Sequence, residues 1–85
     1  MDVSVIIAIT QHRGRIVAVD TSIFNSSIDA IDEFTTLFER EYGVEYPDSD
    51  EHILQSLRGN EPVIFATSTK NGFDTAYILE SNYVK

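Results

Sequence analysis

Hydrophobic and polar residues alternate at the start of the chain. In the first ten residues, one side of the alternation carries a β-branched series, Val3, Val5, Ile7 and Ile9. A period of two with this composition predicts a strand over Met1–Thr10. A turn is predicted at Gln11–Gly14, and the alternation then resumes over Arg15–Thr21. The N-terminal segment therefore predicts a β-hairpin.

The C-terminal segment shows the same alternation. Pro62 precedes a predicted strand over Val63–Thr69, and a last strand is predicted over Phe73–Tyr83. Between them lies the sequence Lys70-Asn71-Gly72. Because Asn-Gly accepts the positive φ angles of a type I′ turn, we expect a second tight hairpin here.

The middle of the chain changes to the helical period. After the helix-starting residues at Asn25–Ser27, apolar residues recur three to four positions apart. The resulting stripe consists of Ile28, Ile31, Phe34, Leu37, Phe38 and Tyr42. Gly43 stands where a glycine would end such a helix. A helix from Ser27 to Tyr42 is therefore predicted.

A second, shorter helix is predicted after the connector Val44–Pro47. Asp48 and Glu51 have the spacing of a capping box, with Asp48 as the N-cap. The apolar face that follows ends at Gly59. Together these segments give the order β-β-α-α-β-β over a single domain, residues 1–85. They predict an α+β, two-layer fold, in which two β-hairpins form a four-stranded antiparallel sheet with two helices on one face.

The sheet face without helices is expected to be moderately apolar. Small and branched residues assigned to it are Ile6, Ala8, Ala18, Ala66, Ala76 and Ile78. Such a face is either half-solvated or a packing surface for a second copy. A homodimer is therefore one interpretation of this face.

Composition narrows the classes of protein. Cysteine is absent, so disulfides and thiolate metal sites are excluded. Asp2 precedes the apolar start, where a signal peptide would carry basic residues, and no run approaches the ~18 apolar residues of a membrane span. A cytoplasmic protein is expected. No catalytic motif or glycine-rich phosphate loop is present, so neither an enzyme nor a cofactor or metal is predicted.

Charge is the strongest deviation from an average domain. The net charge is −8, which disfavours direct binding to nucleic acid or to an anionic membrane and favours a basic partner. Nine acids and one base, Arg40, lie in the stretch Asp29–Glu51. Solubility alone is the plainer explanation of this composition.

Helix electrostatics explain only part of this acidic stretch. Helix N-termini favour negative charge, which accounts for the acids near the two predicted starts. Glu39 and Glu41 instead lie in the last predicted turn of the first helix, where a carboxylate is disfavoured by about 0.3–1 kcal/mol. Sequences that break a local rule without compensation often do so at functional sites. We therefore predict a partner-binding surface that consists of Asp29, Asp32, Glu33, Glu39, Glu41, Tyr42, Glu45, Tyr46, Asp48, Asp50 and Glu51.

Acids three or four residues apart on a helix lie about 5–6 Å apart, comparable with neighbouring phosphates of a nucleic-acid strand. In size, charge and predicted architecture the chain resembles the small acidic proteins with which phages and mobile elements block nucleases. We therefore predict an inhibitor or decoy of the DNA-mimic type, whose partner is a nuclease or another nucleic-acid-binding protein. Such an inhibitor could serve a phage against host defence. The first helix alone is too sparsely charged, so the connector and second helix would have to lie beside it. The alternative is an assembly module that forms a homo-oligomer through its sheet, with acids for solubility.

Overall fold

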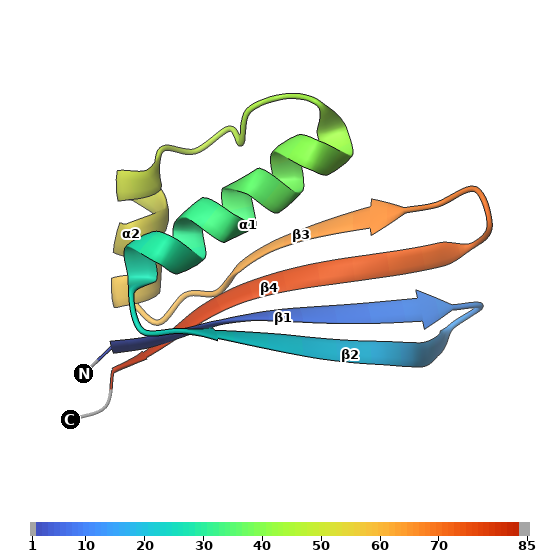
Figure 1. The fold of residues 1–85 in the computed structure, drawn as a ribbon, viewed down its shortest axis with the longest axis horizontal. Helices are drawn as coiled ribbons and strands as arrows, with labels where there is room; N and C mark the ends of the chain where they lie inside the picture. Colours follow the sequence, from blue (N-terminus) through green and yellow to red (C-terminus); the bar gives the residue numbers. More distant parts are fainter. Residues whose placement is uncertain (1, 84–85) are drawn as a thin grey trace.

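The computed structural model describes residues 2–83, which form one four-stranded antiparallel sheet with two helices over one of its faces (Figure 1). In chain order the elements are β1 (Asp2–His12), β2 (Arg15–Phe24), α1 (Ser27–Tyr42), α2 (Asp50–Arg58), β3 (Val63–Ser68) and β4 (Phe73–Tyr83). The strand order is β2-β1-β4-β3, so the two hairpins meet through β1 and β4. The predicted α+β fold is confirmed. The predicted strand start at Met1 lies outside the described residues.

The first hairpin turn lies within its predicted range, whereas the second differs in turn type from its prediction. Arg13 and Gly14 both have positive φ, 52° and 81°, as a two-residue type I′ turn requires. In the second hairpin the Gly72 N–H donates to the Thr69 carbonyl at 3.1 Å, and Gly72 has φ 83° whereas Asn71 has no positive φ. A four-residue turn ending in a left-handed glycine therefore replaces the predicted type I′ turn at Asn-Gly.

The helix ends follow short-range capping rules. The Ser26 side chain accepts a backbone N–H from the first turn of α1, and Gly43 ends that helix in the left-handed region, as predicted. In α2 the N-cap is Ser49, because its side chain accepts the His52 N–H at 3.2 Å. The prediction of Asp48 as the cap is wrong by one residue, since serine and aspartate are equally good caps and stand side by side.

The core lies between the helices and one sheet face. Ile6 in β1 pairs with Leu79 in β4, and both are buried beneath the helices. α1 packs over β1, β4 and β2, whereas α2 packs over β3 and β4. The buried apolar residues are Ile6, Ala30, Ile31, Phe34, Ile53, Leu57, Phe65 and Leu79.

Three serine hydroxyls join α1 to the sheet at its first residue. Ser4 of β1 and Ser81 of β4 lie 2.6 Å apart (Oγ–Oγ), and the Ser27 hydroxyl lies 2.9 Å from that of Ser4. Ser4 and Ser81 are buried, so this contact satisfies hydroxyls that would otherwise lack partners. It fixes where α1 leaves the sheet.

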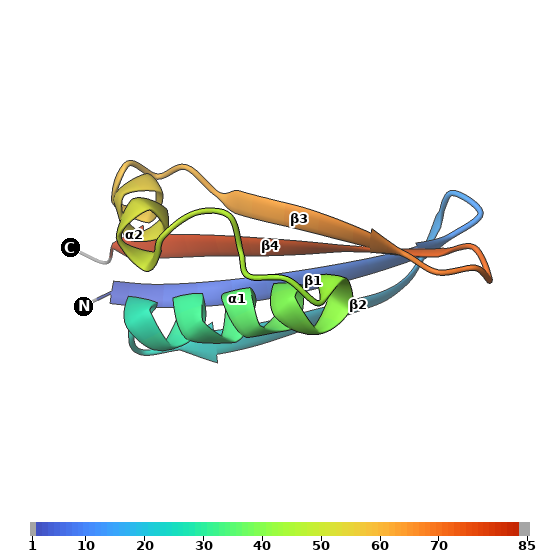
Figure 2. The same ribbon diagram turned by 90° about the horizontal axis from the view of Figure 1, so that it is seen from above.

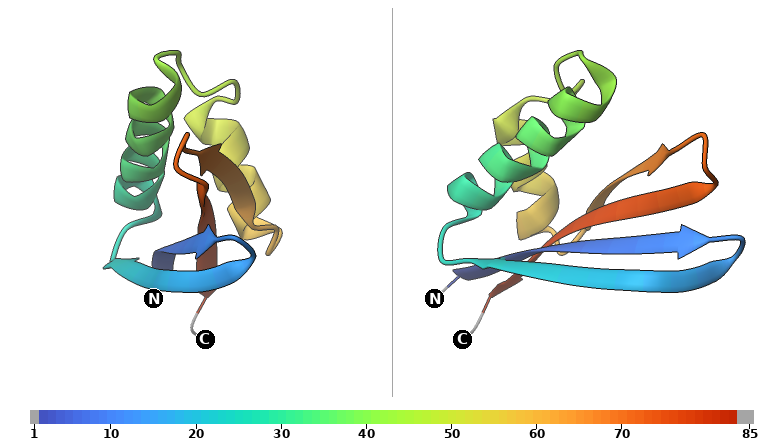
Figure 3. Two further views of the ribbon diagram at one scale, coloured as in Figure 1. Left: turned by 90° about the vertical axis from the view of Figure 1, so that its right-hand side faces the viewer. Right: turned by 45° about the vertical axis from the view of Figure 1, so that its right-hand side comes forward.

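The helices cover only part of the sheet. Both hairpin ends project beyond them along the 41 Å axis of the molecule (Figures 1 and 2). The opposite face carries no element of residues 2–83, as the two oblique views show (Figure 3). We call this the open face. Cross-strand register assigns to it Val3, Val5, Ile7, Ile9, Val19, Ile23, Ile64, Ala66, Ala76 and Ile78.

The predicted composition of this face is half wrong. Ala66, Ala76 and Ile78 lie on it, but Ile6 and its neighbours Ala8 and Ala18 lie on the helix-bearing face: Ala8 pairs with Tyr77, and Thr10 with Ala18. Both sides of β1 are apolar, so a period of two could not say which side met the helices. In α1, Ile28 is also misassigned to the core stripe, because it is 71% exposed.

Candidate functional site

One side of α1 and the connector to α2 enclose a depression of about 390 Å³. Five carboxylates line it, and none of its lining residues is Lys, Arg or His. The lining consists of Asp32, Thr35, Thr36, Glu39, Glu45, Tyr46, Pro47, Asp48, Ser49 and Asp50. We call this the acidic depression. It offers hydrogen-bond acceptors and hydroxyls, a chemistry that suits guanidinium and ammonium groups.

The residues of α1 that line the acidic depression lie on one side of the helix. Asp32, Thr35, Thr36 and Glu39 are spaced i, i+3, i+4 and i+7, so they lie along one stripe of the helix. The Thr35 hydroxyl donates to the Ile31 carbonyl at 3.0 Å, and thus belongs to the helix itself. The two threonines were not among the predicted site residues, although this spacing would have identified them.

Tyr46 holds the connector against α1. Its half-buried ring meets Phe34 edge-on at 5.8 Å and Phe38 at 4.9 Å between ring centroids. Burial, and then the negative charge of Asp48, raise the pKa of Tyr46 above its ordinary value of 10.0. The phenol therefore stays neutral, and the ring fixes the carboxylates of Glu45 and Asp48 beside those of α1.

Tyr42 also has a structural contact. Its hydroxyl donates to the backbone carbonyl of Ala66 in the edge strand β3. Its ring lies 4.6 Å from that of Phe38 and 6.4 Å from that of Phe65. Tyr42 therefore fastens the C-terminal end of α1 to β3, although its side chain remains 48% exposed.

The other predicted acids lie outside the acidic depression. Asp29, Glu33 and Glu41 are exposed on α1 and do not line it. Glu51 borders a neighbouring depression of about 260 Å³, which is also lined by Asp50 and by the apolar residues Ile28, Ile31 and Leu54. The structure thus gathers six of the eleven predicted residues: Asp32, Glu39, Glu45, Tyr46, Asp48 and Asp50.

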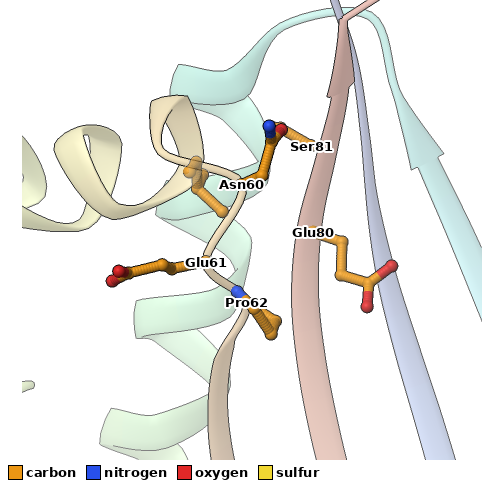
Figure 4. Close-up of a pocket in the computed structure, with 6 residues that line it drawn as sticks. Asn60, Glu61, Pro62, Glu80 and Ser81 are labelled. Atoms are coloured by element: carbon orange, nitrogen blue, oxygen red, sulfur yellow. The ribbon is translucent and has the colours of Figure 1, made fainter.

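A smaller depression of about 250 Å³ lies where α2 leads into β3. Its lining includes two carboxylates, Glu61 and Glu80, with Asn60, Pro62 and Ser81. Figure 4 shows the Glu61 and Glu80 side chains pointing in different directions, on opposite sides of Pro62. They do not converge on one point, as a pair of catalytic carboxylates would.

Within residues 2–83, no three His, Asp or Glu side chains are grouped so that they could hold a metal ion. In the same part of the chain, none of the helices combines the length and apolar character that a membrane crossing needs.

Comparisons with protein-family models, with curated proteins and with solved structures found no match to this chain.

Proposed function

We propose that this chain is a non-catalytic binding protein that occupies the basic cleft of a nucleic-acid-handling protein. The observation that carries the proposal is that five carboxylates line the acidic depression, whose lining contains no basic residue. Such a surface attracts cationic side chains over several ångströms and offers each of them more than one acceptor.

The connector and the start of α2 supply the charge density that α1 lacks alone. The stretch Asp29–Glu51 carries nine acids and one base. The sixteen residues of α1 span about 24 Å, so the combined layer carries about one net charge per 3 Å. Duplex DNA carries one charge per ~1.7 Å of its helix axis, or one per ~3.4 Å of axis for each of its two strands. The density fits a cleft for a single strand better than one for a duplex.

The partner class follows from this match. A nuclease or another protein that binds single strands presents Lys and Arg at the spacing of phosphates. The acids of α1, the connector and the start of α2 would compete with nucleic acid for these basic side chains. The same chemistry suits an anti-defence inhibitor that acts in the cytoplasm. Shallow depressions and acceptor-rich linings support binding rather than catalysis.

Charge reversal tests this proposal. Glu39→Lys with Glu45→Lys changes two acids of the acidic depression, and Asp20→Lys with Glu61→Lys changes two exposed acids elsewhere by the same charge. Tagged wild-type chain and both variants are used to capture proteins from a bacterial lysate, with and without a single-stranded oligonucleotide as competitor.

We expect wild type and the Asp20/Glu61 control to capture basic nucleic-acid-binding proteins, and the oligonucleotide to displace them. The Glu39/Glu45 variant should capture at least about tenfold less, and ~0.5 M salt, where the Debye length is about 4 Å, should weaken capture by the wild type. Equal capture by the two variants, or capture that the oligonucleotide does not affect, would contradict the proposal.

A further inference from the structure

The open face is apolar at its centre. Register aligns Ile7, Ile78 and Ile64 in one row across β1, β4 and β3. The next row along the same strands holds Ile9, Ala76 and Ala66. None of these side chains is fully buried, and Ile64 is 56% exposed. Two adjacent rows of the sheet thus present a continuous apolar surface to solvent.

Polar residues border this centre along the strands. On one side, Glu80 of β4 pairs with Val5 of β1. On the other side, Gln11 pairs with Asp74, which in turn pairs with Ser68. An apolar centre between polar margins is the arrangement found in protein–protein interfaces.

The size of the open face matches one side of a stable dimer. Three strands at the usual spacing run the length from Val3 to Gln11, about 30 Å, and β3 adds six residues or about 20 Å, so the face measures roughly 530 Å² in projection. A standard interface takes about 800 Å² of accessible surface from each partner. Protruding side chains such as Ile23, which is 70% exposed, have more accessible area than their projection, so the open face is comparable in area with one side of such an interface.

The shape of the open face suits a copy of itself. A shallow hollow of about 270 Å³ lies over Ala66 and Ala76, beside Ile9. When two such faces are related by a two-fold axis along the strands, Ile9 and Val19 of one copy lie over the alanines of the other. When the axis runs along the rows, Ile78 and Ile64 take these places. In either arrangement branched side chains of one copy meet the alanines of the other, while Ile7 meets a second isoleucine, Ile78 or Ile9, so the contacts at the centre are apolar.

We propose that a second copy of this chain packs against the open face and forms a face-to-face homodimer. Its eight strands make two stacked sheets with the helices outside. At about 10 Å per layer, the two acidic helix layers lie roughly 30 Å apart, beyond the ~8 Å Debye length at physiological salt. The two acidic helix layers are therefore largely screened from each other, only Asp74 and Glu80 border the open face itself among the acids of its paired strands, and both acidic depressions remain accessible.

The test compares two pairs of exposed hydrophobic positions. Ile64→Lys with Ala66→Lys places charges on the open face, in an edge strand where they remove no buried side chain. The matched control is Ile28→Lys with Val44→Lys, whose positions are 71% and 60% exposed in the helix layer. Molar mass is measured by sedimentation equilibrium from about 1 to about 200 µM, with circular dichroism to verify folding.

We expect wild type and the control to reach twice the monomer mass, and the open-face variant to dimerise at least about tenfold more weakly while it remains folded. A wild type that stays monomeric up to ~200 µM would overturn the proposal, even if the face bound lipid vesicles or another protein. A dimer that survives both open-face lysines would place the contact elsewhere, for example at the edge of β2, and would overturn it too. Neither result depends on the acidic depression, so it leaves the proposed function untouched.

Discussion

Leu79 and Ile78 are neighbours in β4, but they face opposite sides of the sheet. Leu79 is fully buried beneath the helices, whereas Ile78 lies on the open face in a row of isoleucines. The two sides are similarly apolar, and only one is covered within residues 2–83. Because both sides of the strand are apolar, its sequence does not tell which side is covered, and the helices cover only one of them.

The largest expected effect separates these two neighbours. Leu79→Ala removes a fully buried side chain and should lower the free energy of unfolding by about 2–5 kcal/mol. Ile78→Ala should lower it by less than about 1.5 kcal/mol in a dilute monomer, because its side chain already meets solvent. Urea unfolding at low protein concentration measures both. Equal losses would mean that the open face is buried within the monomer.

A smaller effect is expected where the connector joins the helix layer. Tyr46→Ala removes a half-buried ring that packs on Phe34 and Phe38, and should lower stability by about 2 kcal/mol. It should also weaken capture of a basic partner, since Glu45 and Asp48 would no longer be held beside α1. Tyr46→Phe keeps the ring and serves as the control. Unchanged capture by Tyr46→Ala would show that the connector does not help to form the acidic surface.

A gain of stability is expected at the C-terminal end of α1. Glu39→Gln with Glu41→Gln removes two carboxylates from the negative end of the helix dipole, and should raise the free energy of unfolding by about 0.6–2 kcal/mol, at about 0.3–1 kcal/mol for each. Capture of a basic partner should fall in the same variant. If thermal unfolding shows a loss of stability instead, these acids have a stabilising contact and are not there for a partner.

The smallest expected effect is a pH dependence. The folded state keeps the Tyr46 pKa above 10.0, so the stability from its neutral phenol is fully present below pH 10. As pH rises from 10 through the folded-state pKa, the unfolded state loses its proton first, and this stability is lost. The free energy of unfolding, measured with urea between about pH 8 and about pH 11, should therefore fall more steeply for wild type than for Tyr46→Phe. Parallel curves would contradict the burial of this phenol.

Local patterns predicted most of the fold. The cap at Ser26, the glycine that ends α1 and the two hairpins follow from residues close together in sequence. The strand order, the choice of face for Ile6 and the exposure of Ile28 did not follow, because they depend on how distant elements pack. The type I′ turn failed because Asn-Gly is also compatible with a turn in which only the glycine has positive φ.

The sequence predicted the candidate site as a run of acidic residues, but it did not predict the depression that some of them line. Charge counting found Glu39, Glu45 and Asp48, but it could not show that Tyr46 brings the connector beside α1. Nor could it show that the hydroxyl of Tyr42, which is predicted to contact a partner, donates to the Ala66 carbonyl. Aromatic side chains have too many possible partners for sequence spacing to choose among them.

Sedimentation equilibrium of the wild-type chain at about 0.05 M and about 0.5 M NaCl tests most directly whether the two sides of the sheet make different kinds of contact. An apolar interface on the open face predicts a dimer that is retained or strengthened at high salt, because salt screens the repulsion between two acidic copies but does not weaken apolar burial. A dimer that dissociates as salt rises would contradict this account, since it would show self-association through charge, with Arg13 and Arg15 of one copy on the acids of another. A monomer at both salt concentrations would contradict it as well.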